Sequence, residues 1–343
     1  MGARAALILA CIGCAAVAAS ASAAGPVADE TARTAGCDRY ASPGGSDRGR
    51  RRGSRSRPFR SLRRLARSLR RGRTGCLYPG SYRHRTPVRL KRPRTRLRGL
   101  AGGPVRIDGA IWVQGTARGA SLSRLRLTAS DPVYEIPLKV LADDVRVTRN
   151  IITGSGSSTI CVLVGSHRLA RRTRIERNRI SRCGSTGKFD HLIYLEQTRG
   201  ARVSNNLLTA NAGGWAVHMY PDADATVVEN NTIDGNQGGV IFAGDGSGAT
   251  SDYNVVRFNV ITFSNPRWNI EGSWSAGPFG QGNRAHDNCL FTEGPDAPVG
   301  IGALEGFTAD RNVAVAASPY IARPMGDYRL APTSGCPVLA AGR

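Results

Sequence analysis

The chain has 343 residues, a formal net charge of +23 and 41% hydrophobic residues, which suits one long repeat domain with additions. After the N-terminus, no stretch approaches the roughly 18 consecutive apolar residues of a membrane-spanning helix, which excludes a second hydrophobic span. No acidic residue occurs between Asp47 and Asp108, so almost all of the net positive charge lies in that arginine-rich stretch.

Residues 1–23 have the features of a secretory signal. Arg4 precedes an apolar run from Ala5 to Ala19, and Ala21-Ser22-Ala23 fits the small-x-small cleavage rule. The run is short and rich in alanine, which favours cleavage over a membrane anchor, and Cys11 resembles a lipoprotein site only faintly. We therefore expect a secreted, extracellular monomer with no membrane span after cleavage, and a mobile leader over residues 24–36.

Residues 37–87 form an arginine-rich segment that we expect to cap the N-terminal end of the repeat domain, because an open stack would expose its core. Apolar residues at helical spacing predict a short amphipathic helix over Ser61–Arg70, with Ser61 as N-cap and Gly72 as the stop. The arginines then form a solvated face. Binding of an anionic polysaccharide or cell-envelope glycan is the alternative, and nucleic acid is disfavoured because no aromatic platform interrupts the arginines.

An Asn-x-apolar phrase recurs every 24 to 29 residues, and a period of this length is typical of stacked repeats. The repeats are rich in β-branched residues, Gly and Asn, so each coil consists of short strands and turns. One asparagine per coil suits a turn residue that tolerates the left-handed conformation and hydrogen-bonds to its neighbours above and below. We expect these coils over residues 88–318 and a C-terminal cap over residues 319–343. The phrases begin at Asn150, Asn178, Asn206, Asn231, Asn259, Asn288 and Asn312.

A second strand follows each phrase, and these strands can be aligned with one another. The alignment predicts an inward apolar column of Val162, Ile193, Val217, Val240 and Ile270. Strand alternation then predicts an outward column of Leu163, Tyr194, His218, Ile241 and Glu271. A second outward column would contain Gly165, Glu196, Tyr220, Ala243 and Ser273.

Six cysteines remain after cleavage, an even number that suggests disulfides in an exported protein. Their order along the chain favours Cys37 with Cys76, Cys161 with Cys183 and Cys289 with Cys336, with other pairings and free thiols left open. A zinc site is disfavoured because none of these six cysteines forms a Cys-x-x-Cys pair.

The Asn-x-Ile coils resemble secreted right-handed parallel β-helix proteins of the pectate-lyase-like superfamily. The segments Tyr40–Asp47 and Tyr78–Tyr82 resemble the N-terminal cap of such proteins, as does Arg57-Pro58-Phe59, and Asp327–Ser334 resembles their close. The resemblance implies an all-β, right-handed parallel β-helix (solenoid) with a short N-terminal amphipathic capping helix. It does not fix the activity, because the superfamily includes lyases, hydrolases, epimerases and adhesins, and the Arg-x-Pro-x-x-Arg motif of well-characterised pectate lyases is absent.

Cleavage of a uronic-acid polymer by β-elimination needs a base for the proton beside the carboxylate and a cation for the developing enolate. Lys188 or His191 would be the base, and Tyr194 or Tyr220 the proton donor. The predicted catalytic residues are Lys188, Asp190, His191 and His218. The predicted substrate-binding residues are Tyr194, Glu196, Tyr220, Asp222, Asp245 and Glu271.

Each of these residues also has a structural interpretation: a turn histidine, a packed surface histidine, a solvated loop lysine, or tyrosines stacked between coils. The pattern assigns no cofactor, and Ca²⁺ is left open because Asp190, Glu196, Asp222 and Asp245 offer hard oxygens without a dense acidic motif. The leading hypothesis is an exported protein that binds an acidic polysaccharide on this face and acts as a lyase or epimerase. A non-catalytic envelope or matrix adhesive and a glycoside hydrolase using Glu196 with Asp222 or Asp245 are the alternatives.

Overall fold

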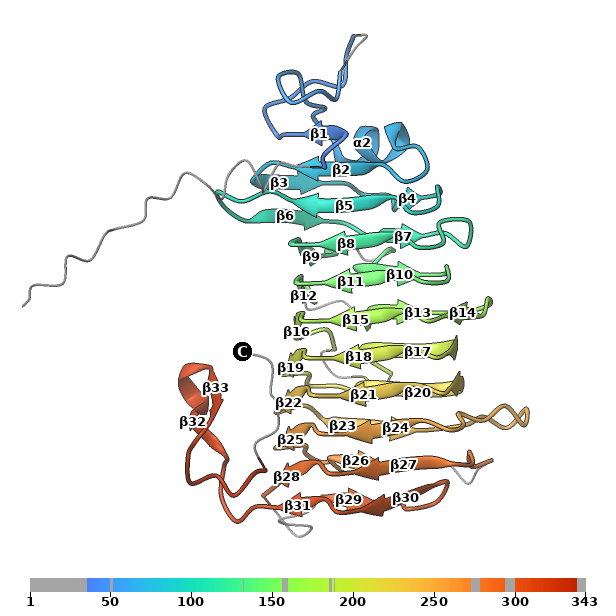
Figure 1. Ribbon diagram of the computed structural model, residues 1–343, viewed down its shortest axis with the longest axis vertical. Helices are drawn as coiled ribbons and strands as arrows, with labels where there is room; N and C mark the ends of the chain where they lie inside the picture. The colour runs from blue at the N-terminus through green and yellow to red at the C-terminus, as the bar shows by residue number, and fades with distance from the viewer. Residues whose placement is uncertain are drawn as a thin grey trace, which may run out of the picture. The chain divides into compact units, whose positions relative to one another are not determined.

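The computed structural model describes residues 36–49, 52–131, 133–155, 160–184, 187, 189–272, 278–293 and 300–337. All but two of its strands form three parallel sheets, named A, B and C, which run along a stack of coils (Figure 1). Successive strands along the chain join sheet C, then sheet A, then sheet B, so each coil adds one strand to every sheet. Among the described residues, no helix is both long and apolar enough to cross a membrane.

The strands of each sheet are short and follow the order of the coils. Sheet A contains β1 (Arg39–Ala41), β2 (Thr74–Leu77), β5 (Arg96–Gly99), β8 (Ser121–Ser123), β11 (Arg146–Thr148), β15 (Arg174–Glu176), β18 (Arg202–Ser204), β21 (Val227–Glu229), β24 (Val255–Arg257), β27 (Asn283–His286) and β30 (Phe307–Asp310). Sheet B contains β3 (Gly80–Arg83), β6 (Val105–Asp108), β9 (Arg126–Thr128), β12 (Ile151–Thr153), β16 (Arg179–Ser181), β19 (Leu207–Thr209), β22 (Thr232–Asp234), β25 (Val260–Thr262), β28 (Cys289–Phe291) and β31 (Val313–Ala314). Sheet C contains β4 (Val88–Leu90), β7 (Ile111–Val113), β10 (Leu138–Val140), β13 (Ile160–Val164), β14 (Ala170–Arg171), β17 (His191–Arg199), β20 (Trp215–Asp224), β23 (Gly238–Phe242), β26 (Ile270–Glu271) and β29 (Ile301–Gly302).

The predicted capping helix is confirmed as α2 (Leu62–Ser68). The Ser61 hydroxyl accepts a hydrogen bond from the Arg64 backbone N–H at 3.1 Å, which satisfies one of the free donors at the helix start. The helix ends before the predicted Arg70, although Leu69 is still buried together with Leu62, Leu65 and Ala66. The sheets already begin upstream of residue 88, since β1, β2 and β3 pair with the coils that follow.

The core is a column of apolar side chains enclosed by the three sheets. The inward column predicted on sheet C is confirmed in register, because Val162, Ile193, Val217, Val240 and Ile270 are successive partners and all are fully buried. Burying each such side chain contributes about 2 kcal/mol. A coil can bury its apolar residues only against the next coil, so the stack is the stable unit.

The predicted asparagine ladder is also confirmed. The Asn178 backbone N–H donates to Oδ1 of Asn206 at 2.9 Å, and the Asn178 side-chain amide donates to the same oxygen at 3.0 Å. The same two bonds recur at every step from Asn150 to Asn312, at 2.9 to 3.1 Å. A second amide hydrogen of Asn178 donates to the Val147 carbonyl at 2.9 Å. Each buried amide is therefore satisfied only when the neighbouring coils are in place.

The ladder differs from the prediction in one respect, because the asparagines themselves are not left-handed. Instead, the residue before each asparagine is in the left-handed conformation, with φ of 55° at Arg149, 57° at Arg177, 56° at Asn205 and 54° at Asn230. That residue turns the chain from sheet A to sheet B, so that the next residue can point its amide inward. A side chain at this position costs about 1 kcal/mol relative to right-handed backbone.

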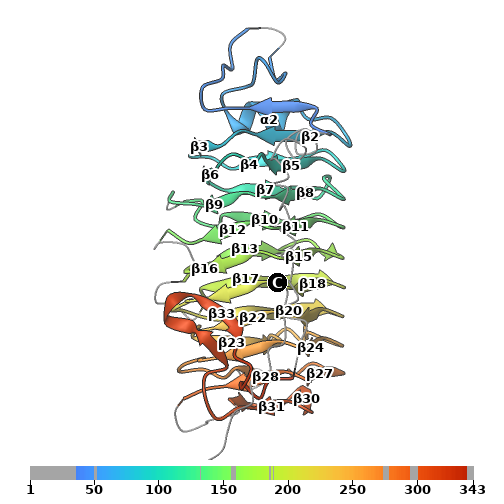
Figure 2. The same ribbon diagram turned by 60° about the vertical axis from the view of Figure 1, so that its left-hand side comes forward.

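The C-terminal segment folds back along the coils. A 3₁₀ turn, η1 (Arg323–Met325), joins β32 (Tyr320–Ala322) to β33 (Asp327–Leu330), and this hairpin lies beside β19–β28 in both views (Figures 1 and 2). Arg323 forms an ion pair with the buried Asp234 of β22 at 2.8 Å. The Tyr320 hydroxyl lies 3.0 Å from the Thr262 hydroxyl of β25. The hairpin therefore covers the outer face of sheet B in the later coils.

The six cysteines form three disulfides in the pairs favoured by their order. Cys37 bonds to Cys76, Cys161 to Cys183 and Cys289 to Cys336, with Cα–Cα distances of 5.8, 5.3 and 5.4 Å. They tie the first strands, a middle coil and the C-terminal segment to the stack. Each such closure stabilises the fold by about 3 kcal/mol.

The ladder yields a stability prediction. Asn206→Ala should lower the free energy of unfolding by about 3 kcal/mol, because the buried Asn178 backbone N–H and one Asn178 amide hydrogen lose their acceptor and the Ile175 carbonyl loses a donor. Urea denaturation followed by circular dichroism measures the change. Thr308→Ala, at an exposed position of β30, is the control and should change the value by less than about 0.5 kcal/mol. A loss below about 1 kcal/mol in Asn206→Ala would contradict the role assigned to the ladder.

Candidate functional site

The outward column predicted on sheet C is confirmed, since Leu163, Tyr194, His218, Ile241 and Glu271 are register partners on successive strands. The second column is interrupted, because β20 contains one extra residue between the partners of Leu195 and Gln197. Such bulges change the direction of neighbouring side chains and are frequent beside functional sites. Ser273, predicted for this column, lies outside the described residues.

The outward column also extends upstream, which the sequence analysis missed. Lys139 pairs with Leu163, Trp112 with Lys139, and Arg89 with Trp112. The Arg89 guanidinium lies 5.0 Å from the centre of the Trp112 ring, and the Lys139 ammonium lies 5.9 Å from it. The column thus begins with two cations on either side of an indole, a favourable cation–π arrangement.

His191 and His218 form a hydrogen-bonded pair between adjacent coils. The Trp215 backbone N–H donates to His191 Nδ1 at 3.2 Å, so the proton of the neutral His191 ring is on Nε2. His191 Nε2 then donates to His218 Nδ1 at 2.8 Å, which leaves the His218 proton on Nε2. That buried His218 Nε2 has no hydrogen-bond partner among the described residues.

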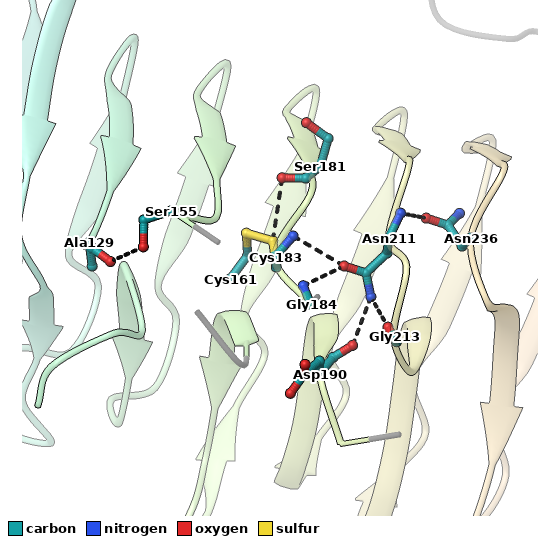
Figure 3. The surroundings of a disulfide bond; sticks show 10 residues. All are labelled: Ala129, Ser155, Cys161, Ser181, Cys183, Gly184, Asp190, Asn211, Gly213 and Asn236. Carbon is teal, nitrogen blue, oxygen red and sulfur yellow. Dashed lines mark hydrogen bonds between the residues drawn. A yellow bond between two sulfur atoms is a disulfide. The ribbon is translucent and has the colours of Figure 1, made fainter. Parts of the chain in front are cut away.

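The backbone between the histidines is closely packed. Gly214 has a φ of +58°, and a Cβ there would lie 2.4 Å from His191 Nδ1. Only glycine therefore allows the Trp215 N–H to approach the imidazole in this conformation. The Asn211 amide holds the preceding loop by donating to the Asp190 carbonyl at 2.7 Å (Figure 3).

Burial keeps both imidazoles neutral. Desolvation lowers the pKa of His191 to about 3, and it lowers the pKa of His218 well below its usual value, with a further contribution from His191. A base with so low a pKa has little driving force for removing a proton from carbon. In this geometry the histidines are better suited to holding rings in place than to proton abstraction.

The histidine pair supports a stack of aromatic rings at the surface. The Tyr194 and Tyr220 rings lie 5.2 and 5.4 Å from the His218 ring, both nearly parallel to it. Both tyrosines are partly exposed. The result is a flat aromatic surface of the kind that packs against sugar rings, with a polar hydroxyl on each tyrosine.

Carboxylates lie close to this stack. Burial raises the pKa of Tyr194, and the negative charges of Glu196 and Asp245 raise it further. Burial and Asp245 raise the pKa of Tyr220 in the same direction, so both phenols stay protonated. Asp245 itself is kept ionised, because hydrogen bonds from Ser247 lower its pKa. Four of the predicted residues therefore lie within electrostatic range of one another.

Lys139 faces this carboxylate group from the upstream side. Its ammonium donates to the Ser166 hydroxyl at 3.3 Å. Burial lowers its pKa, and the charge of Glu196 opposes the shift. A lysine with a lowered pKa is a common general base.

The other predicted residues lie apart from this group. Asp222 is in the charge environment of Asp224, Arg199 and Asp252, where burial and the neighbouring aspartates raise its pKa. Glu271 is fully buried, paired with Arg267 and bonded to the Trp215 indole N–H at 2.5 Å.

The last two predicted catalytic residues precede β17 in the sequence. Asp190 is buried, and its Oδ2 accepts from the Gly187 N–H at 3.1 Å. Lys188 lies outside the described residues. Among the described residues, no three His, Cys, Asp or Glu side chains are grouped closely enough to hold a metal ion.

Two hollows lie elsewhere on the coils. A cavity of about 470 Å³ lies where sheet A turns into sheet B, and four of its lining residues are arginines. Another of about 480 Å³ lies on the early strands of sheet B and includes Arg83, Arg106, Arg126 and Arg182. Sequence analysis did not identify either of them, although the arginines recur at the repeat period.

Comparisons with known proteins agree with this architecture. A family model described as a right-handed β-helix region matches residues 137–293. The chain is therefore a right-handed parallel β-helix protein with the pectate-lyase-like fold, as predicted.

Two solved structures illustrate the range of this fold. The pectate lyase Pel9A is 12% identical over 87% of this chain and 90% of its own, with a TM-score of 0.57. PfbA, a surface adhesin of Streptococcus pneumoniae, is 12% identical over 69% of this chain and 75% of its own, with a TM-score of 0.50. No curated protein matches the sequence. At such identities the likeness concerns the fold alone.

The histidine pair predicts a pH dependence of stability. The folded pKa of His191 is about 3 against an ordinary 6.5, so below about pH 6.5 the unfolded chain binds more protons than the folded one. The stabilisation that comes from the neutral His191 should be fully present above that pH and should decrease as the pH falls. At about pH 5, His191 alone should lower the free energy of unfolding by about 2 kcal/mol.

Urea denaturation between neutral and acidic pH tests this prediction. The difference between the wild type and His191→Gln is the relevant quantity, because every group other than the coupled His218 contributes nearly equally to both. The decrease in the free energy of unfolding per pH unit should be smaller in His191→Gln than in the wild type. Identical slopes would show that the imidazole is not held neutral.

Proposed function

We propose that this protein is an exported polysaccharide lyase that binds a uronic-acid glycan along the outer face of sheet C. The observation that carries the proposal is Lys139, a lysine whose pKa burial lowers, in one outward column with Trp112 and Tyr194. The three disulfides support a location outside the reducing cytoplasm.

The column offers binding groups suited to an acidic sugar chain. At one end the partly exposed Tyr194 and Tyr220 rings provide apolar surface, and at the other end Trp112 holds Arg89 and Lys139 against its ring. Arg89, which is exposed beside Trp112, provides a cation for a sugar carboxylate. Neighbouring strands lie about 4.8 Å apart, so these groups are spread over several coils, as binding of a polymer requires.

The proposed reaction is a β-elimination. The neutral Lys139 amine removes the proton from the carbon beside the sugar carboxylate. The electrons of the broken carbon–hydrogen bond form the new carbon–carbon double bond. The bond to the departing glycosidic oxygen breaks, and that oxygen takes a proton from the Tyr194 phenol, which its raised pKa keeps protonated. Proton exchange with water then restores the lysine and the tyrosine. Ser166, on the coil between the two residues, holds the end of the Lys139 side chain by a hydrogen bond.

The histidines act in this proposal as positioning residues. The neutral pair holds the His218 ring between the two tyrosines, and its unpaired Nε2–H is a donor for a ligand oxygen once the tyrosine rings move. The predicted base His191 is replaced here by Lys139, since the His191 pKa is low and both its ring nitrogens are already bonded. Lys188, the other base predicted from the sequence, lies outside the described residues and stays a prediction.

A hydrolase is the second candidate. Burial and Asp224 raise the pKa of Asp222, whereas Ser247 lowers the pKa of Asp245, and a pair of carboxylates with opposite shifts suits acid and base roles. The two mechanisms differ in product. A hydrolase generates reducing ends without an unsaturated sugar, whereas a lyase generates both.

Lys139→Arg tests the lyase. Arginine keeps the positive charge but cannot act as a base at neutral pH, so turnover on polygalacturonate or alginate should fall by a factor of about 100 or more with binding retained. Appearance of the unsaturated uronate, followed by ultraviolet absorbance, measures turnover. In the wild type the rate should rise with pH through a pKa below the usual lysine range, because the amine is the active form.

Lys91→Arg is the matched control, since Lys91 is an exposed lysine outside the column, and it should behave as the wild type. Turnover that survives Lys139→Arg but is lost in Lys188→Ala would assign the base to Lys188. Binding of polygalacturonate or alginate without formation of any cleavage product would favour an adhesive protein instead.

Tyr194→Phe separates binding from proton donation. The ring remains in the stack with His218, so the affinity for an oligouronate should change by less than about threefold, whereas kcat should fall by about 100-fold because the phenol proton is lost. Titration calorimetry and steady-state kinetics measure the two quantities. Equal losses in affinity and turnover would show that Tyr194 only binds.

A further inference from the structure

A groove rich in arginine lies on a different face from the sheet C column. It is the cavity of about 470 Å³ where sheet A turns into sheet B, and we name it the arginine groove. Its lining residues are Thr148, Arg149, Arg174, Glu176, Arg177, Arg202, Ser204 and Asn205. Glu176 is the single acidic residue among them, so the groove is strongly positive.

The arginines of the groove are stacked in register. Arg146, Arg174 and Arg202 are successive partners on β11, β15 and β18. Like charges directly opposite one another repel and destabilise a sheet. The same column continues with Val227 and Val255, so the fold accepts an apolar residue at this position. The arginines are therefore not required by the coil itself.

Two further arginines occupy the turn beside this column. Arg149 and Arg177 hold the left-handed position before the ladder asparagine, with φ of 55° and 57°. Asn205 and Asn230, at the same position in the next coils, are residues that tolerate this conformation better. A pair of arginines in a strained turn, facing other arginines, suggests a role in binding rather than in folding.

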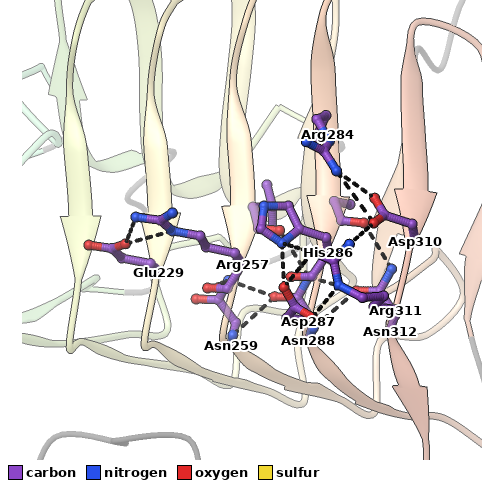
Figure 4. A network of polar contacts seen from close by, with 12 residues as sticks. Glu229, Arg257, Asn259, Arg284, His286, Asp287, Asn288, Asp310, Arg311 and Asn312 are labelled. Carbon is purple, nitrogen blue, oxygen red and sulfur yellow. Dashed lines mark hydrogen bonds and ion pairs between the residues drawn. The ribbon is translucent and has the colours of Figure 1, made fainter.

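The later coils show how the same positions look when the charge is neutralised. Arg257 pairs with Glu229 at 2.8 Å, Arg284 with Asp310 at 3.2 Å and Arg311 with Asp287 at 2.9 Å (Figure 4). Arg284 and Arg311 are there the equivalents of Arg174 and Arg177.

Two of the four groove arginines lack such compensation. Arg202 is paired with Glu229, and Arg174 lies 3.9 Å from Glu176. Arg149 and Arg177 form no ion pair with any residue that the structure describes. Both are exposed, so their guanidinium groups are available to an anion from solution.

We propose that the arginine groove binds a polysaccharide that carries carboxylate or sulfate groups. Guanidinium groups bind such planar or tetrahedral anions through paired hydrogen bonds. The Thr148 hydroxyl and the Asn205 amide, both partly exposed, can bond to sugar hydroxyls between the charges. The arginines span three successive coils, about 10 Å along the stack, so a chain with repeated charges fits better than a single small anion.

A nucleic acid fits this groove less well. Proteins that bind single strands combine positive charge with aromatic rings on which the bases stack. None of the groove-lining residues is aromatic. Hydroxyl and amide groups between guanidinium groups suit a hydrated sugar chain.

This site goes beyond the proposed lyase, because it lies on another face and contains no group of the sheet C column. It would hold a glycan chain without cleaving it. Its test is therefore direct binding, and the outcome is independent of whether the sheet C face is catalytic.

The later coils provide a matched pair of variants. Arg174→Val and Arg177→Asn together give the groove the residues found at the same positions in other coils, so the fold should be retained. Arg284→Val and Arg311→Asn together make the same substitutions at the same positions outside the groove and remove the same charge. Circular dichroism and thermal melts confirm that both proteins are folded.

Affinity is measured by fluorescence anisotropy with labelled heparin and labelled polygalacturonate at physiological salt. The groove double variant should bind at least one of these glycans about tenfold more weakly, whereas the control double variant should differ from the wild type by less than about twofold. Lys139→Arg, measured in parallel, should leave this groove-dependent binding unchanged.

Three results would overturn the proposal. Equal losses in the two double variants would show a response to total charge, and no loss in the groove variant would show that the groove is not used. Single-stranded DNA of equal charge that binds more tightly than both glycans, and depends on the groove arginines, would assign the site to nucleic acid.

Discussion

The hydrogen bond from one asparagine amide to the next is the interaction on which this structure depends. The Oδ1 atom of each ladder residue accepts from the coil before it, and its own amide donates to the coil after it. A buried amide without partners costs about 1–3 kcal/mol, so a coil that shifts by one residue is disfavoured. The ladder therefore fixes the register of all three sheets, including faces that it does not touch.

Fixed register gives the outer faces freedom to differ. The inward positions are restricted to apolar residues, whereas an outward position can change from coil to coil without affecting its neighbours. On sheet C this freedom places an indole, a lysine and an aromatic stack in one line. On sheet A it places arginine, valine and ion-paired arginine at equivalent positions. Function on such a scaffold is a matter of which column is changed and over how many coils.

The repeat period and strand alternation were sufficient to predict the ladder, the inward column and the outward position of Tyr194 and His218. Lys139 was missed for a physical reason. Leu125, not an asparagine, holds the ladder position before Asn150, and its N–H simply donates to the Asn150 side chain. The phrase that marks each coil is therefore absent upstream, and the column could not be extended to Lys139 from the sequence.

The burial of the site residues could not be predicted from the sequence either. Alternation places Glu271 and His218 outward, but it cannot show that Trp215 and Arg267 cover the Glu271 carboxylate, or that two tyrosines enclose the His218 ring. The Trp215–Glu271 and Tyr194–His218 contacts join different coils, whereas Arg267 and Tyr220 contact a residue of their own coil. All four contacts depend on side-chain directions. The electrostatic properties of the site, unlike its register, require the three-dimensional arrangement.

The positions of the disulfides have a consequence for how the molecule comes apart. In a one-dimensional array the end units have a single neighbour, so unravelling starts there and moves inward. Cys37–Cys76 and Cys289–Cys336 tie residues near the two ends of the stack, and Cys161–Cys183 ties a coil in the middle. With these bonds intact, fraying is arrested and the stack melts as one cooperative unit. In a reducing compartment the same chain would shorten from its ends, so the redox potential of the surroundings sets how many coils persist.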